Sequence, residues 1–347
     1  MEYILVSIIS AQTIPNLLLI KELRGSYSGM LFISTEEMEG RGNPSKSRSQ
    51  WIERAAGILE GTTPRVVVRE DNWPDIEQKL AGYMNHEIQY LVNLTGGTKV
   101  MTLAVYKHFA RPGNRIFYVP FPKNQYCELY PDFNSLPISI SYRCTLSQYL
   151  AIHGLYFSCH LMRTNHQSAT EMLFEKVKSN DFNLLSIPEI KYAHELEIPE
   201  DKSYYSGGWF EEYLYYWLKN VFKLSENRIA RNVQLFRNQD DWEPDNEYDL
   251  MFVWKNALYV IECKASAGNQ SNARKNIDRF LYKLGAITRD FGLKVNSFVF
   301  TLTKFRDKKG MLPEKLKKRK NILGIREIFD QESFYTPEKI IIMIKNS

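Results

Sequence analysis

Short runs of β-branched and aromatic residues alternate with segments of helical apolar spacing over the first 145 residues. The pattern predicts strands at residues 3–9, 30–34, 65–69, 88–94 and 115–120. Residues 15–23 begin with a proline at a first-turn position, and residues 46–59 place Trp51, Ala55 and Ile58 on one face, so both segments predict helices. Strands joined by crossover helices are typical of a parallel sheet. Residues 1–145 are therefore expected to form a Rossmann-like α/β domain.

A second series of elements starts at Gly207 and Gly208. The pattern predicts an amphipathic helix at 209–224, strands at 229–236, 247–254 and 257–264, a long helix at 272–291 and a strand at 297–302. This order predicts a second α/β domain over residues 206–347. Residues 146–205 show helical spacing only at 146–154 and 168–178, and we interpret them as a connector or a small winged-helix-like module.

The composition excludes several classes of protein. With 44% hydrophobic and 24% charged residues, the 347-residue chain is neither disordered nor fibrous, and its length suits two domains. The net charge of +5 describes a mildly basic protein. Four cysteines without C-x-x-C spacing indicate reduced thiols of a cytoplasmic protein. No apolar run approaches the roughly 18 to 20 residues of a membrane span, so we expect a soluble protein without a membrane partner.

Charged residues lie near the ends of two neighbouring predicted strands. Asp249 lies at the start of one strand, and Glu262 and Lys264 lie near the end of the next, pointing to the same face while Cys263 points to the other. Two carboxylates, with the backbone carbonyl of Cys263, make an oxygen-ligand site that suits Mg²⁺ or Mn²⁺. Such an ion polarises a phosphoryl oxygen and lowers the pKa of a bound water, which Lys264 can orient. The pattern predicts phosphodiester hydrolysis.

An alternative is that these side chains form an ion-pair ladder on an exposed hairpin. The surrounding residues argue against it, because Val260, Ile261 and Cys263 are apolar on both faces and indicate a buried strand. Charged side chains are costly to bury without a partner or a function. We therefore prefer the metal-site interpretation.

An Asp followed thirteen residues later by Glu-x-Lys resembles the PD-(D/E)xK restriction-endonuclease-like superfamily. The match in this chain is Asp249 with Glu262, Cys263 and Lys264. In that superfamily the carboxylates bind the metal and the lysine helps to activate water. The resemblance implies a restriction-endonuclease-like fold for residues 206–347 and catalytic roles for these side chains.

The helix before this pair of strands adds further candidates. It begins with Gly-Gly-Trp-Phe-Glu-Glu-Tyr at residue 207, similar to the superfamily's first helix, which often contributes another acidic residue to the metal site. Glu211 shares a helical stripe with Leu214 and Leu218 and is expected to face inward, whereas Glu212 lies on the adjacent stripe. We therefore choose Glu211. Gln270, after the second strand, is a further polar candidate.

A glycine turn is the notable feature of the first domain. Residues 93–99 read Asn-Leu-Thr-Gly-Gly-Thr-Lys, and the turn opens a predicted helix whose free N–H groups and dipole suit a phosphate. The Walker A and G-x-G-x-x-G patterns are absent from the sequence. A second loop, Ser-Ala-Gln-Thr-Ile-Pro-Asn at residues 10–16, follows the first strand. Ligands of open α/β sheets bind beyond the carboxyl ends of the strands, where both loops are expected to meet.

Together with Ser-Thr-Glu-Glu-Met at residues 34–38, these loops resemble the CARF domain, the CRISPR-associated Rossmann fold. Most of the chain is thus similar to the CARF and PD-(D/E)xK fusion nucleases of type III CRISPR antiviral defence. That family implies a homodimer that binds a cyclic oligoadenylate, usually cyclic tetra-adenylate, and then cleaves nucleic acid. The implied ligand contacts are Gln12, Thr13, Thr95, Gly96, Gly97, Thr98 and Lys99. Residues 41–46 are a candidate for closing over the ligand.

Other functions remain to be weighed. A HEPN ribonuclease is excluded, because none of the six histidines has an arginine five to seven positions earlier. A transcription regulator would use residues 145–205 as a helix-turn-helix and the C-terminal half only to dimerise, which would leave Asp249, Glu262 and Lys264 without a role. A binding module would hold DNA without cutting it through the basic run at 304–320, where nine of seventeen residues are Lys or Arg. The sequence leaves open DNA or RNA, single or double strands, the ring size of the activator, and whether the first domain degrades that ring.

Overall fold

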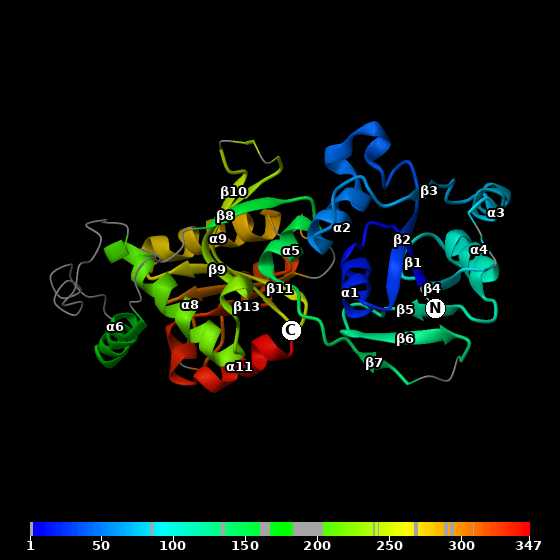
Figure 1. Cartoon of the computed structure of the whole chain (residues 1–347). Helices are drawn as coiled ribbons and strands as arrows, with labels where there is room; N and C mark the ends of the chain where they lie inside the picture. The colour runs from blue at the N-terminus through cyan, green and yellow to red at the C-terminus, as the bar shows by residue number, and fades with distance from the viewer. Residues whose placement is uncertain are drawn as a thin grey trace. The chain divides into compact units, whose positions relative to one another are not determined.

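The computed structural model divides into two compact units. It describes residues 3–83, 85, 87–132, 136–159, 167–182, 204–238, 240–241, 243–266, 270–287, 291, 295–307 and 309–347, without the side chains of 205, 270–275 and 287. Unit 1 comprises Met1–Tyr156 with Arg237–Asp241, and unit 2 comprises Phe157–Phe236 with Trp242–Ser347. Figure 1 shows the chain coloured from its N-terminus to its C-terminus.

Unit 1 contains a seven-stranded sheet with the order β3-β2-β1-β4-β5-β6-β7. Its strands are β1 (Tyr3–Ile8), β2 (Tyr27–Ser34), β3 (Arg65–Val67), β4 (Gln89–Asn93), β5 (Arg115–Tyr118), β6 (Gln125–Tyr130) and β7 (Ile138–Ser139). The first five are parallel, as the sequence predicts, whereas β6 and β7 add an antiparallel edge. This edge is not predicted by the sequence pattern, because every residue of β6 is only half-buried, which leaves no clear alternation.

The helices of unit 1 cover both faces of the sheet. They are α1 (Ile14–Glu22), α2 (Arg48–Ala56), α3 (Trp73–Ala81), α4 (Lys99–Phe109) and α5 (Leu146–Ala151). Helix α1 packs beside α2 and α3 packs beside α4, and Figure 1 shows these two pairs on opposite sides of the sheet. Val6 and Ile8 of β1 are buried in the core beneath α3 and α4. The Rossmann-like prediction for this part of the chain is confirmed.

The strand order of unit 1 brings two of its loops next to each other. Strand β1 pairs with β2 on one side and with β4 on the other, so the strand order reverses about β1. In such a sheet the loops after the two central strands diverge and leave a crevice at their carboxyl ends. Residues 9–13 after β1 and residues 94–98 after β4 are therefore adjacent, and they form the candidate ligand site of unit 1.

Unit 2 contains a six-stranded sheet with the order β13-β12-β11-β10-β9-β8. Its strands are β8 (Tyr156–Cys159), β9 (Ile229–Phe236), β10 (Asn246–Trp254), β11 (Ala257–Lys264), β12 (Val295–Thr301) and β13 (Glu327–Phe329). Strands β9, β10 and β11 form an antiparallel meander, and β12 and β13 continue the sheet in parallel with β11. The predicted α/β character of the second domain is confirmed.

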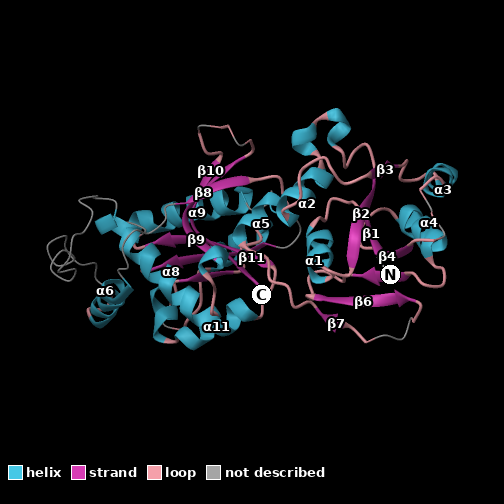
Figure 2. Cartoon of the chain, in the orientation of Figure 1, coloured by secondary structure: helices cyan, strands magenta, loops and turns pink. Residues whose placement is uncertain are grey.

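Helices flank this second sheet, as Figure 2 shows in cyan against magenta strands. They are α6 (Gln167–Ser179), the π-helical turn η3 (Tyr204–Gly208), α8 (Trp209–Phe222), α9 (Gln270–Ile287), α10 (Glu314–Ile322) and α11 (Pro337–Lys345). Helix α8 buries Phe210, Leu214 and Leu218 in a core that also contains Ile261 and Cys263 of β11.

The predicted connector is divided between the two units where it is described. Helix α5 lies in unit 1, and most of β8 and all of α6 lie in unit 2. Phe174 of α6 stacks on Tyr213 of α8 with ring centroids 4.0 Å apart, so α6 is part of the unit 2 core. Residues 160–166 and 183–203 lie outside the described part, and the winged-helix-like interpretation stays a prediction.

Two residues of the basic run at 304–320, Arg306 and Lys320, serve the fold of unit 2. Asp330 is fully buried and accepts hydrogen bonds from the backbone N–H groups of Phe305 and Arg306, both at 2.8 Å, and from the Arg306 guanidinium at 2.6 Å. Lys320 is nearly buried and donates to Glu327 at 2.9 Å. These cations neutralise carboxylates inside the protein, because a buried charge without a partner is costly.

No helix within the described ranges is long and apolar enough to cross a membrane. This agrees with the absence of long apolar runs in the sequence.

Replacing Asp330 by alanine should lower the free energy of unfolding by about 3 to 5 kcal/mol, because Arg306 and two backbone N–H groups lose their buried acceptor. Urea unfolding followed by tryptophan fluorescence measures this change. Lys309→Ala, at an exposed position of the same segment, is the matched control and should stay within about 0.5 kcal/mol of the wild type. A similarly small effect of Asp330→Ala would contradict the structural role of this network.

Candidate functional site

The backbone of unit 2 brings the three predicted catalytic side chains together. The pairing of β10 with β11 ends at Leu250 and Ile261, so Asp249 lies just beyond the ladder. Its Oδ2 accepts a hydrogen bond from the backbone N–H of Cys263 at 2.7 Å. The Asp249 carboxylate thus continues the connection between the two strands with its side chain, within β10 and just beyond the end of the β10–β11 ladder.

Lys264 joins the two carboxylates. Its Nζ lies 2.9 Å from Asp249 Oδ2 and 2.9 Å from Glu262 Oε1. The side chain of Glu262 is only 4% exposed, and those of Asp249 and Lys264 are 16% and 24% exposed. An ion-pair ladder on an open hairpin is therefore ruled out as a description of this group. We call Asp249, Glu262 and Lys264 the carboxylate–lysine cluster.

Helix α9 contributes contacts that the sequence analysis did not identify. The Lys264 ammonium lies 5.1 Å from the ring centre of Phe280, and Nζ of Lys283 lies 3.9 Å from Glu262 Oε2. Since Phe280 and Lys283 are three residues apart, they lie on one side of α9. Helical spacing could have indicated that stripe, but not that it faces Glu262. The Gln270 side chain lies outside the described part.

The cluster carries more negative than positive charge. Burial raises the pKa of Glu262, and the nearby Asp249 carboxylate raises it further. Burial alone would lower the pKa of Lys264, but Asp249 and Glu262 outweigh it and hold that pKa above its usual value. Lys264 is therefore protonated at neutral pH in this arrangement, and it compensates only part of the charge of its carboxylate neighbours.

Two acidic residues begin helix α8, and they have different environments. Burial, followed by the charge of Asp249, raises the pKa of Glu211 to about 7, and Lys264 opposes this shift. Glu212 is 1% exposed, and its Oε2 lies 3.6 Å from Nη1 of Arg231, which also donates to the backbone carbonyl of Gly208 at 3.2 Å. The charge of the cluster thus affects the pKa of Glu211. Glu212 instead pairs with Arg231 and helps to fix the start of the helix.

The donors of the cluster suit a hard divalent cation. Carboxylate and carbonyl oxygens are the ligands that Mg²⁺ and Mn²⁺ prefer, and Asp249 and Glu262 converge to within 2.9 Å of one atom. In the described ranges, no group of three or more His, Cys, Asp or Glu side chains forms a metal-binding cluster. The fit therefore rests on two carboxylates and a backbone carbonyl.

In unit 1 the two predicted loops are in contact, and glycines make this possible. Gly96 and Gly97 have φ angles of +103° and +71°, which side chains rarely adopt. A Cβ atom on Gly96 would lie 2.5 Å from Ser10 Oγ, and one on Gly97 would lie 2.7 Å from Cγ2 of Ile8. Any larger residue at either position would push the loop after β4 away from the loop after β1.

The seven predicted ligand-contact residues differ in their burial. Thr13 and Thr95 are buried, and their hydroxyl groups bond to the backbone of Ile152 and Val119, each at 2.8 Å, so these side chains hold the loops in place. Gln12, Gly97, Thr98 and Lys99 are exposed, and Gly96 is half-buried between the two loops.

Thr98 connects the glycine turn to its surroundings. Its Oγ1 accepts a hydrogen bond from the N–H of Met101 at 3.2 Å, which caps α4, and donates to the carbonyl of Glu70 at 2.6 Å. The side chain of Asn93, the first residue of the motif, accepts a hydrogen bond from the N–H of Thr95 at 3.0 Å. The turn is thus fixed from both sides, and the exposed Lys99 is the cation nearest to it in sequence.

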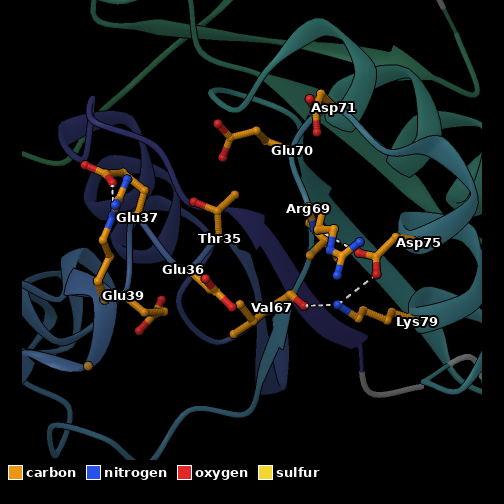
Figure 3. A pocket seen from close by; sticks show the side chains of 13 residues that line it. Thr35, Glu36, Glu37, Glu39, Val67, Arg69, Glu70, Asp71, Asp75 and Lys79 are labelled. Atoms are coloured by element: carbon orange, nitrogen blue, oxygen red, sulfur yellow. Dashed lines mark hydrogen bonds and ion pairs between the residues drawn. The ribbon is translucent and has the colours of Figure 1, made fainter.

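A cavity of about 1200 Å³ lies next to Thr98 at the carboxyl ends of β2 and β3. Figure 3 shows its lining, in which Asp75 accepts from the N–H of Arg69 and Lys79 donates to the carbonyl of Val67. Its charged residues are Glu36, Glu37, Glu39, Glu70, Asp71 and Asp75 against Arg41, Arg69 and Lys79. Since the acids outnumber the cations, this cavity disfavours a polyanion, whereas the exposed turn at 97–99 favours one.

The segment at 41–46 consists of two short 3-10 turns, Gly40–Gly42 and Pro44–Lys46. Glu39 anchors it, because its carboxylate accepts hydrogen bonds from Ser47 and Ser49 at the start of α2. Arg41 and Gly42 line the acidic cavity. The expectation that this segment closes over a ligand stays a prediction.

Comparison with known families assigns both halves of the chain. Residues 4–149 match the family model of the Card1 CARF domain, and residues 199–333 match that of the Card1-like endonuclease domain. No curated protein sequence matches the chain.

Solved structures share the architecture at low sequence identity. Protein VC1899 from Vibrio cholerae has a TM-score of 0.75 and 18% identity over 95% of this chain and 94% of its own. Can2 from Sulfobacillus thermosulfidooxidans, in complex with cyclic tetra-adenylate, has a TM-score of 0.69 and 18% identity over 99% and 96%. A type III CRISPR defence DNA nuclease activated by cyclic oligoadenylate has a TM-score of 0.62 and 17% identity over 92% of this chain and 52% of its own. These likenesses establish the fold.

Replacing Asp249 by asparagine should lower the pKa of Glu211 below its value of about 7, because the negative charge of Asp249 is, after burial, the largest cause of the shift. Carboxyl-carbon NMR titration of the metal-free protein measures this pKa. Glu247→Gln, at an exposed position of the same strand, is the control and should leave the pKa unchanged. An unchanged pKa in Asp249→Asn would show that Glu211 does not sense the cluster.

Proposed function

The chain belongs to the family that joins a Card1 CARF domain to a Card1-like endonuclease domain, and we propose that it is a metal-dependent endonuclease activated by a cyclic oligoadenylate. The observation that carries the catalytic part is the convergence of buried Asp249 and Glu262 on the Lys264 ammonium. The role in type III CRISPR antiviral defence follows from the same family and from the similarity to a nuclease of that defence.

In the proposed site, the oxygens of Asp249, Glu262 and the Cys263 carbonyl hold Mg²⁺ or Mn²⁺. When bound, this ion lowers the pKa of a water and polarises the phosphoryl oxygen of the scissile bond. Lys264 would donate a hydrogen bond to the attacking water and orient it. Glu211 closes the site from α8, and its pKa near 7 leaves it able to take up or release a proton at neutral pH.

The activator belongs at the loops of unit 1. Can2, which shares the fold over nearly its whole length, is bound to cyclic tetra-adenylate, and this supports that ring as the first ligand to test. Gln12, Thr98, Lys99 and the free N–H groups of the glycine turn are exposed and suit its phosphates, while Thr13, Thr95 and Gly96 hold the two loops together. In a two-fold homodimer each protomer offers the same loops to one half of the ring.

Lys264→Ala should reduce cleavage by at least about 100-fold while leaving activator binding unchanged, because the water loses its orienting group and the carboxylates lose their cation. Cleavage of single-stranded RNA, single-stranded DNA and supercoiled plasmid, with Mn²⁺ and cyclic tetra-adenylate, measures the effect and identifies the substrate. Lys255→Ala, in the turn between β10 and β11, is the control.

Cleavage by Lys264→Ala at the wild-type rate would refute the catalytic assignment. A wild-type protein that binds the activator but cuts none of the three substrates would instead favour a regulator that binds nucleic acid without cutting it.

Lys99→Ala should raise the activator concentration for half-maximal cleavage about tenfold or more, because the glycine turn loses its nearest cation. This variant is cleaner than Thr98→Ala, which would also remove the N-cap of α4. Lys107→Ala, at the other end of the same helix, is the control. Equal activation of Lys99→Ala and the wild type would exclude Lys99 from the ligand site.

A further inference from the structure

Helix α9 presents cations next to the carboxylate–lysine cluster. Lys283 is 43% exposed and faces Glu262, and Arg279, one turn earlier, is exposed with its guanidinium 5.6 Å from the ring centre of Phe280. Residues four apart lie on one stripe of a helix, so Arg279 and Lys283 form a continuous positive edge. Lys283 is the member of this edge that reaches the cluster, at 3.9 Å from Glu262.

Helix α10 extends this edge because it is fixed against α9. Arg319 of α10 forms an ion pair with Asp278 of α9, and its guanidinium lies 5.3 Å from the ring centre of Tyr282. A Cβ atom on Gly285 would lie 2.9 Å from Leu323 Cβ, so the glycine permits the end of α10 to approach α9 closely. The two helices therefore present their exposed residues in a fixed arrangement.

The basic residues of α10 lie on different sides of the helix. Lys320 is buried together with Leu316, which defines the inward face of the helix. At 100° per residue, Lys315 falls on the same side as Arg319 and thus toward α9, whereas Lys317 falls on the opposite side. Both lysines are exposed, and no ion pair of either is found among the described residues.

We propose that Arg279, Lys283 and Lys315 form a docking face for the phosphate backbone of the substrate strand. Asp278 is the only acidic residue in the described part of α9, and it already forms an ion pair with Arg319. Exposed cations in fixed positions beside a phosphodiester-cleaving site suit a polyanionic strand. The proposal rests on the proposed nuclease function, and it names where the substrate is held.

The test measures binding without cleavage. The full-length protein, in EDTA and with cyclic tetra-adenylate, is titrated with fluorescein-labelled single-stranded DNA and with a duplex of the same sequence at several salt concentrations. The Arg279→Ala/Lys315→Ala double variant should bind more weakly, with the slope of log K against log salt shallower by about 1.4 on the single strand. Lys317→Ala, an exposed lysine on the opposite side of the same helix, should keep the wild-type slope.

A wild-type slope in the double variant on both probes would overturn the docking face, and so would an equal loss in Lys317→Ala. Cleavage assays with Mn²⁺ separate this proposal from the proposed function. If the wild type cuts and the double variant binds and cuts like it, only the docking face fails. If the wild type cuts nothing, the nuclease function fails, and the salt slopes still decide where the strand binds.

Discussion

The placement of charge inside unit 2 depends on one ammonium group. Lys264 lies between two carboxylates that are largely removed from water, and without it their mutual repulsion would oppose folding. The strand geometry supplies this arrangement, because Glu262 and Lys264 share a face of β11 and Asp249 caps the neighbouring ladder. Burial is the largest cause of the raised pKa values of Glu211 and Glu262, and the negative charge of Asp249 raises both further. A site in this state favours the arrival of a further cation.

The candidate sites of the two units are built in different ways. Unit 2 uses buried side chains that rigid strands hold at hydrogen-bonding distance. Unit 1 uses backbone: its glycine turn exposes N–H groups at the start of α4, and the threonine hydroxyls around it are mostly occupied in holding the loops. Of the residues predicted to touch a ligand, Thr13 and Thr95 therefore act as supports, and the exposed Thr98 also uses its hydroxyl to cap α4. The side chains of Gln12 and Lys99 are exposed.

Sequence patterns predicted the parts of the fold that have strong periodicity. The five parallel strands of unit 1 and the meander of unit 2 were recognisable because their strands are buried and bounded by turns. Strand β6 was not, because it lies near an edge and is half-buried throughout. The Asp-Glu-x-Lys spacing identified the cluster, but the approach of Lys283 depends on how α9 packs, which no local pattern encodes. The basic run at 304–320 was also ambiguous, since its sequence does not separate Arg306 and Lys320, which neutralise internal acids, from the exposed lysines.

The hydrogen bond from the Cys263 N–H gives Asp249 a structural role in addition to its proposed catalytic role. This structural role affects the results of a screen of substitutions at this position. A residue that serves only chemistry tolerates isosteric changes in an abundance screen and fails in an activity screen. Asp249 should score poorly in both for any side chain that lacks an acceptor, whereas asparagine retains one for the Cys263 N–H. The comparison of these two profiles along β10 and β11 would separate the residues that build the strand end from those that act on a substrate.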